Sequence, residues 1–347
     1  MKIAMLRGPR DLHIEEHELD TNNLEPDEVW IKTEISALKI GTDRGNYEGA
    51  ERVPGAPDYP RGVGDSNFGV VQGFGDAVKR FQVGDRVVTQ QNHQSEYIIR
   101  DAPSIVKVPE GVHPENAVYT HLYNLSSLCY RKAYFQPGEN VAVVGLGVLG
   151  LGAIALGQVF GARVIGIGNS GIRLEMAERM GAHAVFMSDD SQLGTKLDSL
   201  TDSVGVDLVI LTANPWPAFR TSLQIVRRNG RVSIVSLLGR GEPPLDFNPL
   251  AMELFYSKGI SIIAVSGAAG NLYPAANQDT PYAAQDAKDR FAVDQSAGYI
   301  LSLMGDGRLE PKRLVTHRFH YTEMAKAYEM IYRREKEMLG VIFEWGD

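Results

Sequence analysis

Three closely spaced glycines follow an apolar run near the middle of the chain. The run Val141–Val144 is typical of a buried strand, and it leads directly into Gly145-Leu146-Gly147-Val148-Leu149-Gly150. A Gly-x-Gly-x-x-Gly spacing between a strand and a helical pattern, which here continues to Phe160, is that of a dinucleotide-binding turn. The glycines permit the tight turn, the approach of a pyrophosphate and close packing of the helix, whose N-terminus offers N–H groups to the phosphates. The predicted contacts are Gly145, Gly147, Val148, Leu149 and Gly150.

The residues after the second predicted strand bear on which nicotinamide cofactor is bound. NAD-binding folds place an acidic residue there, about 20 residues after the glycines, to bind the ribose 2′-hydroxyl. Here the strand Arg163–Ile167 is followed by Gly168, Asn169 and Ser170, and one turn later by Arg173. Amide, hydroxyl and guanidinium donors without a carboxylate favour a 2′-phosphate, so we expect NADP(H) in preference to NAD(H). The alternative is that Arg173 is an ordinary solvated arginine and the ribose is held loosely.

Residues that end the fourth and fifth predicted strands are further candidates for cofactor binding. Ligands bind at the carboxyl ends of the strands of an open parallel sheet. The residues after the fourth strand would line the channel between adenine and nicotinamide, and those after the fifth strand would face the nicotinamide. These residues are Thr212, Ala213 and Asn214 after the fourth strand, and Ser236 and Leu237 after the fifth.

The middle of the chain alternates short apolar strands with helical patterns. Such strands indicate a parallel sheet covered on both faces, and six of them make a complete doubly wound Rossmann fold of the α/β class. The predicted strands are Val141–Val144, Arg163–Ile167, Ala184–Met187, Val206–Leu211, Arg231–Val235 and Ile260–Val265. The helical patterns include Arg173–Met180 and Trp216–Arg228, closed by Gly181 and Gly230.

The first ~120 residues predict an irregular antiparallel β domain, because apolar and polar residues alternate and turn residues separate the runs. Strands are expected over residues 29–36, Phe68–Gln72, Arg86–Gln90 and Glu96–Arg100. The last part of the chain predicts a helix, a strand, a helix and a strand, at Phe291–Met304, Val315–Phe319, Tyr321–Arg334 and Gly340–Phe343. The polar stretch Ser266–Asp289 is a candidate lid or interface loop, with a plain surface insertion as the alternative.

Composition narrows the class of protein. With 347 residues, 44% hydrophobic and 22% charged, the chain is typical of a soluble globular protein with room for two domains. No apolar run approaches the ~20 residues of a membrane span, and the first eight residues indicate a strand and no leader peptide, so we expect a cytoplasmic protein. A net charge of −8 without a basic cluster argues against nucleic acid and anionic membranes as partners. The single cysteine, Cys129, excludes intrachain disulfides and a Cys-rich zinc site.

The order of motifs along the whole chain resembles the medium-chain dehydrogenase/reductase superfamily of the zinc alcohol dehydrogenase type. Within it, the chain looks most similar to a zinc-free branch that includes bacteriochlorophyllide-type alcohol dehydrogenases. The motifs that carry the resemblance are Ile40–Asp43, Gly64–Ser66, Gly69–Val71, Val83–Val87, Pro137-Gly138, the three glycines, Arg173–Ala182 and Thr316–Arg318.

The resemblance implies a division of the chain into two domains. Residues 1–121 and 268–347 would form a GroES-like catalytic domain, and residues 122–267 would form the Rossmann domain inserted between them. The active site would lie in the cleft and act on a small molecule. The resemblance also implies a homodimer joined through the edge strand Ile260–Val265.

Departures from the superfamily's pattern concern the catalytic metal. The resemblance implies three zinc ligands: a Cys before Gly-Thr-Asp, the His of Gly-His-Glu, and a residue where the chain enters the nucleotide domain. This chain has Ile40 at the first position, Asp65 followed by Ser66 at the second, and His121 at the third. Because Ile cannot bind zinc and two ligands leave a tetrahedral site incomplete, we expect no zinc.

Without zinc, side chains must move the hydroxyl proton and stabilise the alkoxide-like oxygen. We expect His121 to be the acid/base, with Asp65 in hydrogen-bond reach to raise the imidazole pKa and hold its tautomer. Thr42 would be a second donor to the substrate oxygen. The alternative is structural, with Asp65 as a turn residue and His121 as a partly buried histidine at a helix start. Asp43 is expected to orient nearby backbone.

Aromatic and imidazole side chains near the same segments are candidate substrate contacts. A phenol can supply a proton, although tyrosines that bridge core and surface are common, and a structural role is the alternative for each. The polar run around His93 could face the cleft or form a solvated turn. The candidates are Tyr47, Tyr59, His93 and Tyr123, whereas Cys129 is expected to be a small core residue.

The sequence therefore predicts a zinc-independent NADP(H)-dependent oxidoreductase that interconverts a secondary alcohol and a ketone. The substrate would be a polyol, cyclitol, sugar or biosynthetic intermediate, which the sequence does not name. One alternative is an enoyl or quinone reductase, in which hydride goes to a carbon conjugated to a carbonyl. Another is a non-catalytic nucleotide-binding protein. The retained Gly41-Thr42-Asp43 favours C–OH chemistry.

Overall fold

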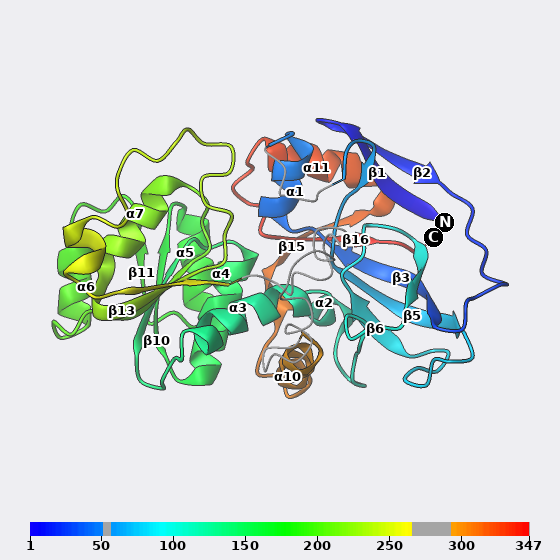
Figure 1. Cartoon of the computed structure of the whole chain (residues 1–347), viewed down its shortest axis with the longest axis horizontal. Helices are drawn as coiled ribbons and strands as arrows, with labels where there is room; N and C mark the ends of the chain where they lie inside the picture. The colour runs from blue at the N-terminus through cyan, green and yellow to red at the C-terminus, as the bar shows by residue number, and fades with distance from the viewer. Residues whose placement is uncertain (51–56, 266–292, 347) are drawn as a thin grey trace. The chain divides into compact units, whose positions relative to one another are not determined.

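The computed structural model describes residues 1–50, 57–265 and 293–346 of the chain (Figure 1). The chain divides into two compact units. Unit 1 comprises Met1–His121 and Ala268–Asp347, and unit 2 comprises Leu122–Gly267. The segment Ser266–Asp289, a candidate lid or interface loop, lies outside the described residues. Within the described ranges, no helix is long and apolar enough to cross a membrane.

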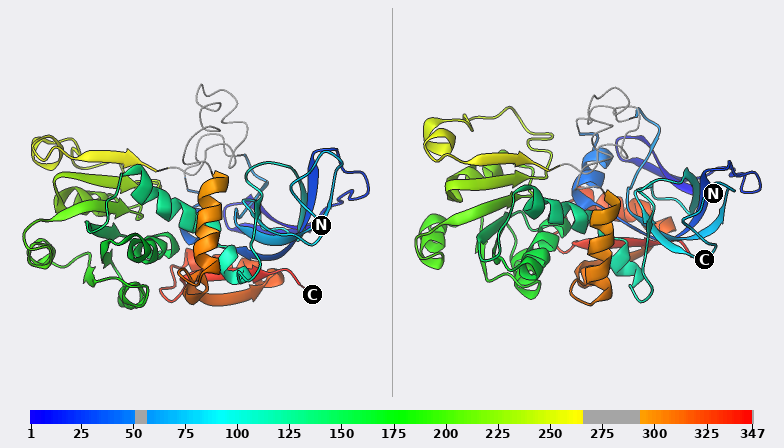
Figure 2. Two further views of the ribbon diagram at one scale, coloured as in Figure 1. Left: turned by 90° about the horizontal axis from the view of Figure 1, so that it is seen from below. Right: turned by 60° about the horizontal axis from the view of Figure 1, so that its bottom comes forward.

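Unit 2 is built on a six-stranded parallel sheet with the strand order β11-β10-β9-β12-β13-β14, which is that of a Rossmann fold. All residues of β9 and β12 are buried, so both faces of the sheet are covered there. The β14 strand forms one edge of the sheet (Figure 2). The strands are β9 (Asn140–Val144), β10 (Arg163–Gly168), β11 (Ala184–Met187), β12 (Val206–Leu211), β13 (Val226–Ile234) and β14 (Ser261–Ala264). The helices of unit 2 are α4 (Val148–Phe160), α5 (Gly171–Arg179), α6 (Leu193–Leu200), α7 (Trp216–Ile225) and a π-helix at Met252–Tyr256, and α3 (Thr120–Lys132) enters the unit from unit 1.

All six predicted strands of the sheet are present, but one helix is shorter than expected. The predicted helix Trp216–Arg228 ends as α7 at Ile225, and β13 begins with the extended residue Val226. Gly230, predicted to close the helix, lies inside β13. At this helix end, Lys258 Nζ donates to the carbonyl oxygens of Leu223, Gln224 and Val226 at 2.7, 2.7 and 2.9 Å. These bonds satisfy carbonyls that another helical turn would otherwise have to pair.

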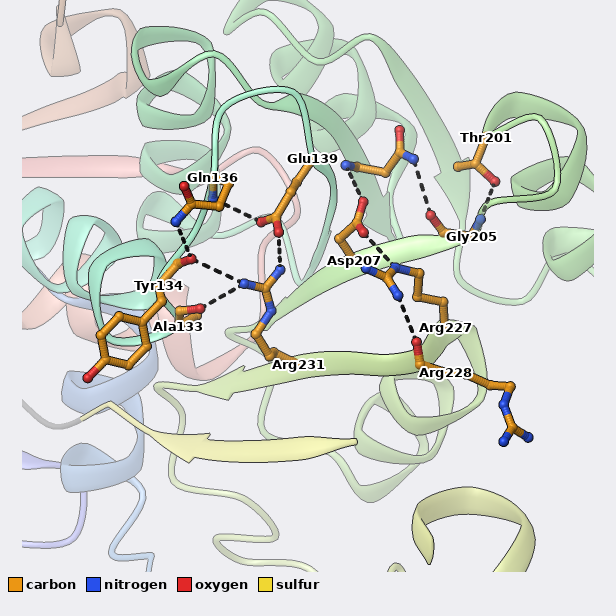
Figure 3. Close-up of polar contacts among 11 residues, drawn as sticks. Ala133, Tyr134, Gln136, Glu139, Thr201, Gly205, Asp207, Arg227, Arg228 and Arg231 are labelled. Carbon is orange, nitrogen blue, oxygen red and sulfur yellow. Dashed lines mark hydrogen bonds and ion pairs between the residues drawn. The ribbon is translucent and has the colours of Figure 1, made fainter. Parts of the chain in front are cut away.

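The amino ends of the strands in unit 2 are tied together by charged side chains (Figure 3). Asp207 Oδ2 accepts the backbone N–H of Asn140 at 2.8 Å, and its Oδ1 accepts Arg227 Nε at 2.5 Å. Arg231 Nη2 pairs with Glu139 Oε1 at 2.6 Å. Because the glycine motif follows the opposite, carboxyl end of β9, these ion pairs stabilise the sheet without occupying the ligand-binding edge.

Unit 1 contains a seven-stranded and a three-stranded sheet, both mainly antiparallel. The central strand is β3 (Glu28–Ala37), in which Val29, Ile31 and Thr33 are buried and Lys32 and Glu34 are exposed, so the predicted alternation is confirmed up to Glu34. It is wrong at the end of the strand, where Ile35 is half-buried and Ser36 is buried after a register shift against β5. Its partners are β5, β7 and β16. The remaining strands are β1 (Lys2–Gly8), β2 (Asp11–Glu16), β4 (Arg61–Gly62), β5 (Asn67–Phe74), β6 (Arg86–Thr89), β7 (Glu96–Arg100), β8 (Val106–Lys107), β15 (Val315–His320) and β16 (Gly340–Glu344).

Helices of unit 1 pack on these sheets and include one that the sequence does not predict. Helix α1 (Ile40–Tyr47) contains Gly41 and Gly45, which lower its intrinsic helix propensity. It packs against α11 around the buried residues Tyr47 and Tyr328. The other helical segments are α2 (Pro114–Ala117), α10 (Val293–Gly305), α11 (Met324–Tyr332) and the 3-10 turns Pro311–Leu314 and Tyr321–Glu323.

Candidate active site

The glycine motif forms a tight turn between β9 and α4. Gly145 has φ +101°, and a Cβ atom added there would lie 2.7 Å from the backbone nitrogen of Ala213. A Cβ at Gly150 would lie 1.9 Å from the carbonyl oxygen of Gly145. Thr212 Oγ1 donates to that same oxygen at 2.7 Å and holds the turn. The first and third positions therefore admit glycine only.

The second glycine of the motif has open space above it. A Cβ at Gly147, the N-cap of α4, would meet only Arg173 Nη1, at 3.7 Å. Arg173 Nη1 donates to the carbonyl oxygen of Leu146 at 3.1 Å, so the guanidinium lies over the turn. An exposed backbone at a helix N-terminus fits the pyrophosphate of a dinucleotide, and the guanidinium beside it fits a further phosphate.

The end of β10 carries no acidic side chain. Gly168 packs against Leu146, whose Cδ1 would lie 2.9 Å from a Cβ at this position. Asn169 is exposed, and Ser170 is the half-buried N-cap of α5 whose side chain makes no capping hydrogen bond. The amide and hydroxyl groups are therefore available to a ligand.

The predicted residues after β12 and β13 lie together. Ser236 Oγ donates to the carbonyl oxygen of Ala213 at 3.0 Å, and the backbone N–H of Gly239 donates to the carbonyl oxygen of Asn214 at 2.9 Å. Leu237 is half exposed. The two loops follow the carboxyl ends of β12, which is adjacent to β9, and of β13, which is adjacent to β12, so the predicted residues lie at the same carboxyl end of the sheet as the glycine motif.

The most conspicuous polar feature of unit 1 is a buried ion pair that the sequence does not predict. Lys39 Nζ lies 2.6 Å from Asp65 Oδ2, with side-chain exposures of 7% and 12%. Lys39 is the N-cap of α1, and Asp65 follows Gly64, which has φ +90°. The other carboxylate oxygen, Asp65 Oδ1, is buried and has no hydrogen-bond partner in the described part of the chain.

This ion pair contradicts the expected role of Asp65. No hydrogen bond joins Asp65 to His121 in the described structure, and the buried Nδ1 of His121 has no partner there. The pKa of His121 is lowered well below its ordinary value, first by burial and then by the positive charge of Lys39. The expectation that a carboxylate raises this pKa is therefore wrong, because the carboxylate is already paired with an ammonium. His121, half-buried at the start of α3, is a neutral imidazole.

Asp43 orients the backbone beside this ion pair, as expected. Its Oδ2 accepts the backbone N–H of Lys39 at 2.8 Å, and its Oδ1 accepts the Tyr328 hydroxyl at 2.8 Å. Burial and the nearby Asp65 raise the pKa of Asp43 to about 7, against the lowering effect of these hydrogen bonds.

His93 is fully buried, so the polar run around it is not a solvated turn at this residue. Its Nδ1 lies 2.8 Å from Ser36 Oγ, which also accepts the Trp345 Nε1–H at 2.8 Å. The described part of the chain gives the Ser36 hydroxyl hydrogen no acceptor other than His93 Nδ1, so the hydroxyl donates to this ring nitrogen. This places the ring hydrogen of His93 on Nε2, a buried donor without a partner among the described residues. Burial, followed by the charge of Lys39, lowers the pKa of His93 to about 3.

The other candidates differ in their surroundings. Tyr47 is buried in the apolar core and its hydroxyl donates to Glu329 at 3.3 Å, which corrects its candidacy as a substrate contact. Tyr59 donates to the carbonyl oxygen of Asn46 at 3.4 Å. Tyr123 belongs to unit 2, where its buried ring packs against Gly152 of α4. Thr42 is exposed in the first turn of α1, so its hydroxyl is accessible.

Comparison with known proteins identifies the family of the chain. The family model "Alcohol dehydrogenase GroES-like domain" matches residues 25–120, and "Zinc-binding dehydrogenase" matches residues 148–279. Together they cover more than half of the chain. The chain belongs to the medium-chain dehydrogenase/reductase superfamily. It is an NAD(P)-dependent oxidoreductase of the alcohol dehydrogenase type.

Relatives of this dehydrogenase include proteins of more than one specificity. Sorbitol dehydrogenase of Bacillus subtilis (strain 168) is 26% identical over 84% of this chain and 93% of that protein. The alcohol dehydrogenase TADH from Thermus sp. ATN1 has a TM-score of 0.80 at 21% identity, covering 99% of both chains. Escherichia coli quinone oxidoreductase, complexed with NADPH, has a TM-score of 0.76 at 18% identity, covering 99% of this chain and 100% of that one. The two structures show the shared fold.

The residues at the superfamily's zinc positions do not fit that metal in this dehydrogenase. Ile40 has no donor atom, and Asp65 is engaged by the Lys39 ammonium. No group of three or more His, Cys, Asp or Glu side chains in the described ranges could hold a metal ion. A zinc ion beside an ammonium, with His121 as its remaining ligand, would lack the tetrahedral donor set it requires.

Lys39 is the functional candidate that sequence reasoning missed in this dehydrogenase. Lysine is almost never fully buried unless it is paired, so a lysine between Leu38 and Ile40 gave no reason to expect an active-site cation. The one available signal was the acidic residue at a zinc-ligand position, Asp65, which is costly to bury without a positively charged partner.

Proposed function

We propose that this dehydrogenase interconverts a secondary alcohol and a ketone with NADP(H) and without zinc. The observation that carries the proposal is the ion pair of Lys39 with Asp65. The resemblance implies metal ligands at the positions of Asp65 and of Ile40, which directly follows Lys39. Bound nicotinamide supplies or accepts the hydride. The chain's own residues must then hold the substrate oxygen and accept its proton.

The preference for NADP(H) is supported by the surroundings of Arg173. The end of β10 offers Gly168, Asn169 and Ser170 and no carboxylate that would repel a 2′-phosphate. Arg173 lies over the glycine turn, bonded to the Leu146 carbonyl. A guanidinium can make charge-assisted, bidentate hydrogen bonds to a phosphate.

The acid/base in this proposal is His121, acting as a base during alcohol oxidation. Burial and the charge of Lys39 lower its pKa, which keeps the imidazole neutral with a free lone pair for the proton but makes it a weaker base than an exposed histidine. Because its side chain is half-buried, the proton can pass on to solvent. The exposed Thr42 hydroxyl would be a second hydrogen-bond donor to the substrate.

The substrate class in this proposal is a polyol, a cyclitol, a sugar or a related biosynthetic intermediate. A relative that covers most of the chain is named sorbitol dehydrogenase, and sorbitol is a polyol. We also propose a cytoplasmic homodimer joined through β14, an edge strand on which Ile262 is partly exposed.

The cofactor is tested by titrating NADPH and NADH into the wild type, Arg173→Ala and Arg179→Ala. Arg179 lies on the same helix, and its exposed side chain pairs with Glu175, so it is a matched control. We expect Arg173→Ala to raise the Kd of NADPH by about tenfold or more, because a charge-assisted hydrogen bond to the 2′-phosphate is lost. The Kd of NADH, which lacks this phosphate, should stay unchanged. Equal effects on both nucleotides, or tighter binding of NADH by the wild type, would overturn the NADP(H) assignment.

The reaction is tested with chelator-treated protein. Polyols and other secondary alcohols are offered with NADP⁺, and ketones and conjugated enones are offered with NADPH. Turnover of alcohols and ketones supports the proposal. Reduction of enones alone would replace it with enoyl or quinone reduction, and loss of activity on chelation that zinc restores would contradict zinc independence.

A further inference from the structure

Lys39 is held firmly at both ends of the residue. Its backbone N–H is bonded to Asp43 Oδ2, and Asp43 Oδ1 in turn accepts the hydroxyl of Tyr328. At the far end, the ammonium is 2.6 Å from Asp65 Oδ2. An ammonium has three hydrogen-bond donors, and the only partner that the described structure gives to this one is Asp65.

Three buried polar atoms without partners in the described part of the chain belong to residues that interact with this ammonium: Asp65 Oδ1, His93 Nε2 and His121 Nδ1. Asp65 is the ion-pair partner, and the charge of Lys39 lowers the pKa of both histidines. The His93 ring packs against Gly64, where a Cβ would lie 2.5 Å from the imidazole Cδ2, and Gly64 directly precedes Asp65. Buried polar atoms are almost always satisfied in folded proteins, so unsatisfied ones beside an incompletely used ammonium indicate a place for a polar ligand.

We propose that the Lys39 ammonium, positioned by Asp65, binds the substrate oxygen and stabilises its negative charge in place of the metal. This inference rests on the proposed alcohol and ketone chemistry. In alcohol oxidation, the hydroxyl proton would pass to His121, and bound nicotinamide would supply the acceptor for the hydride that leaves with the electron pair of the carbinol C–H bond. The oxygen lone pair then forms the second carbon–oxygen bond. Lys39 keeps its protons throughout and stabilises the alkoxide by charge.

The burial of the ion pair supports an electrostatic role. Water is largely excluded at side-chain exposures of 7% and 12%, and a fixed charge acts more strongly on a developing oxyanion there than it would in solvent. A buried ion pair is weak evidence for stability, since apolar replacements often serve as well. Structural need alone therefore does not account for a lysine at this position.

The test compares Lys39→Met with the double variant Lys39→Met/Asp65→Leu. The single variant leaves a carboxylate buried alone and is expected to be less stable, whereas the double variant removes both charges and is expected to recover the lost stability. We expect both variants to lose about 100-fold or more in kcat while their Kd for NADPH stays unchanged. Recovery of kcat together with thermal stability in the double variant would show a structural role and overturn the proposal. Lys107→Met, which breaks the more exposed pair with Asp85 in the same unit, should leave kcat and stability unchanged.

A binding measurement keeps the inference independent of turnover. Formate, a small anion that mimics the charge of the alkoxide, is titrated by calorimetry into NADP⁺-saturated protein. The wild type and Lys39→Arg are expected to bind formate, and Lys39→Met to bind it at least about tenfold more weakly. Absence of binding by the wild type, or equal binding by Lys39→Met, would refute the role of Lys39. Absence of alcohol and ketone turnover in a wild type that does bind formate would refute only the proposed reaction.

Discussion

Lys39 Nζ and Asp65 Oδ2 lie 2.6 Å apart in the interior of unit 1. This contact changes the electrostatics around His121, because the carboxylate that was expected to raise its pKa is paired with the ammonium of Lys39. The ammonium in turn lowers the pKa of both His121 and His93. The positive charge at this place is therefore the ammonium of Lys39, and the two histidines whose pKa it lowers are neutral.

The glycine motif allows a prediction that separates folding from cofactor binding. Gly150→Ala would place a Cβ 1.9 Å from the Gly145 carbonyl oxygen, and Gly147→Ala would meet only Arg173, at 3.7 Å. We expect Gly150→Ala to lower the free energy of unfolding by about 3 kcal/mol, as overpacking does. Gly147→Ala should fold normally and weaken NADPH binding at least about tenfold, equivalent to about 1.4 kcal/mol. Chemical denaturation and nucleotide titration check the pair, and normal cofactor affinity in Gly147→Ala would show that the pyrophosphate does not approach this residue.

The pKa of Asp43 predicts how stability depends on pH. Burial, with Asp65 nearby, raises this pKa from 3.8 to about 7, so between these values the folded protein holds a proton that the unfolded chain has released. The resulting stability is fully present below the unfolded value and is lost as pH rises through about 7. From pH 5 to 8 we expect the wild type to lose up to about 3 kcal/mol relative to Asp43→Asn, in which this group does not titrate. Denaturant unfolding at several pH values measures the difference, and parallel pH profiles of the two proteins would contradict it.

The contacts of His93 predict its protonation state directly. Burial and the charge of Lys39 lower its pKa to about 3, and the hydroxyl of Ser36 donates to Nδ1. Ring ¹⁵N resonances of His93 should therefore report a neutral imidazole with its hydrogen on Nε2 throughout pH 5 to 8. Ser36→Ala should lose this tautomer preference, and His93→Gln assigns the signals. An imidazolium at pH 6 in the wild type would be incompatible with this arrangement.

The contacts of Lys258 predict a stabilising role at the end of α7. Its ammonium donates to three carbonyl oxygens at that helix end, and partial burial lowers its pKa. Lys258→Met should cost about 2 kcal/mol, since hydrogen bonds to charged groups are among the stronger ones. Lys196→Met removes a more exposed pair with Asp190 and should change stability by less than about 0.5 kcal/mol. Thermal unfolding of the two variants checks the comparison. Similar losses of stability in both would show that the bonds of Lys258 to the end of α7 contribute no more than an exposed ion pair.

The parallel sheet was predictable because each of its strands is a short apolar run followed by a turn. Patterns of this kind depend on neighbouring residues, and β11 and β12 have the predicted bounds. The end of α7 was not predictable in the same way. No proline or glycine lies between Gln224 and Arg228, and the group that binds the carbonyls at the helix end is Lys258, which is distant in sequence.

The candidate site was predictable in part for the same reason. Its glycines are recognisable because their spacing is local, and the structure shows why Gly145 and Gly150 cannot carry a side chain. The partner of Asp65 is not recognisable, because a lysine in the sequence gives no sign that it will be buried. Only the fold brings Lys39 to Asp65 and leaves His121 without a carboxylate.

The pairing of β16 with β3 has a consequence for the order in which the protein matures on the ribosome. Phe343 pairs with Ser36, and Trp345 donates to the Ser36 hydroxyl that holds His93. Unit 2 is a continuous stretch that can fold as a unit during translation, whereas β3 must wait for residues near 345 before its sheet is complete. The nascent chain would thus complete its Rossmann unit first, and the contacts that hold His93 would form only after residues near 345 had been added.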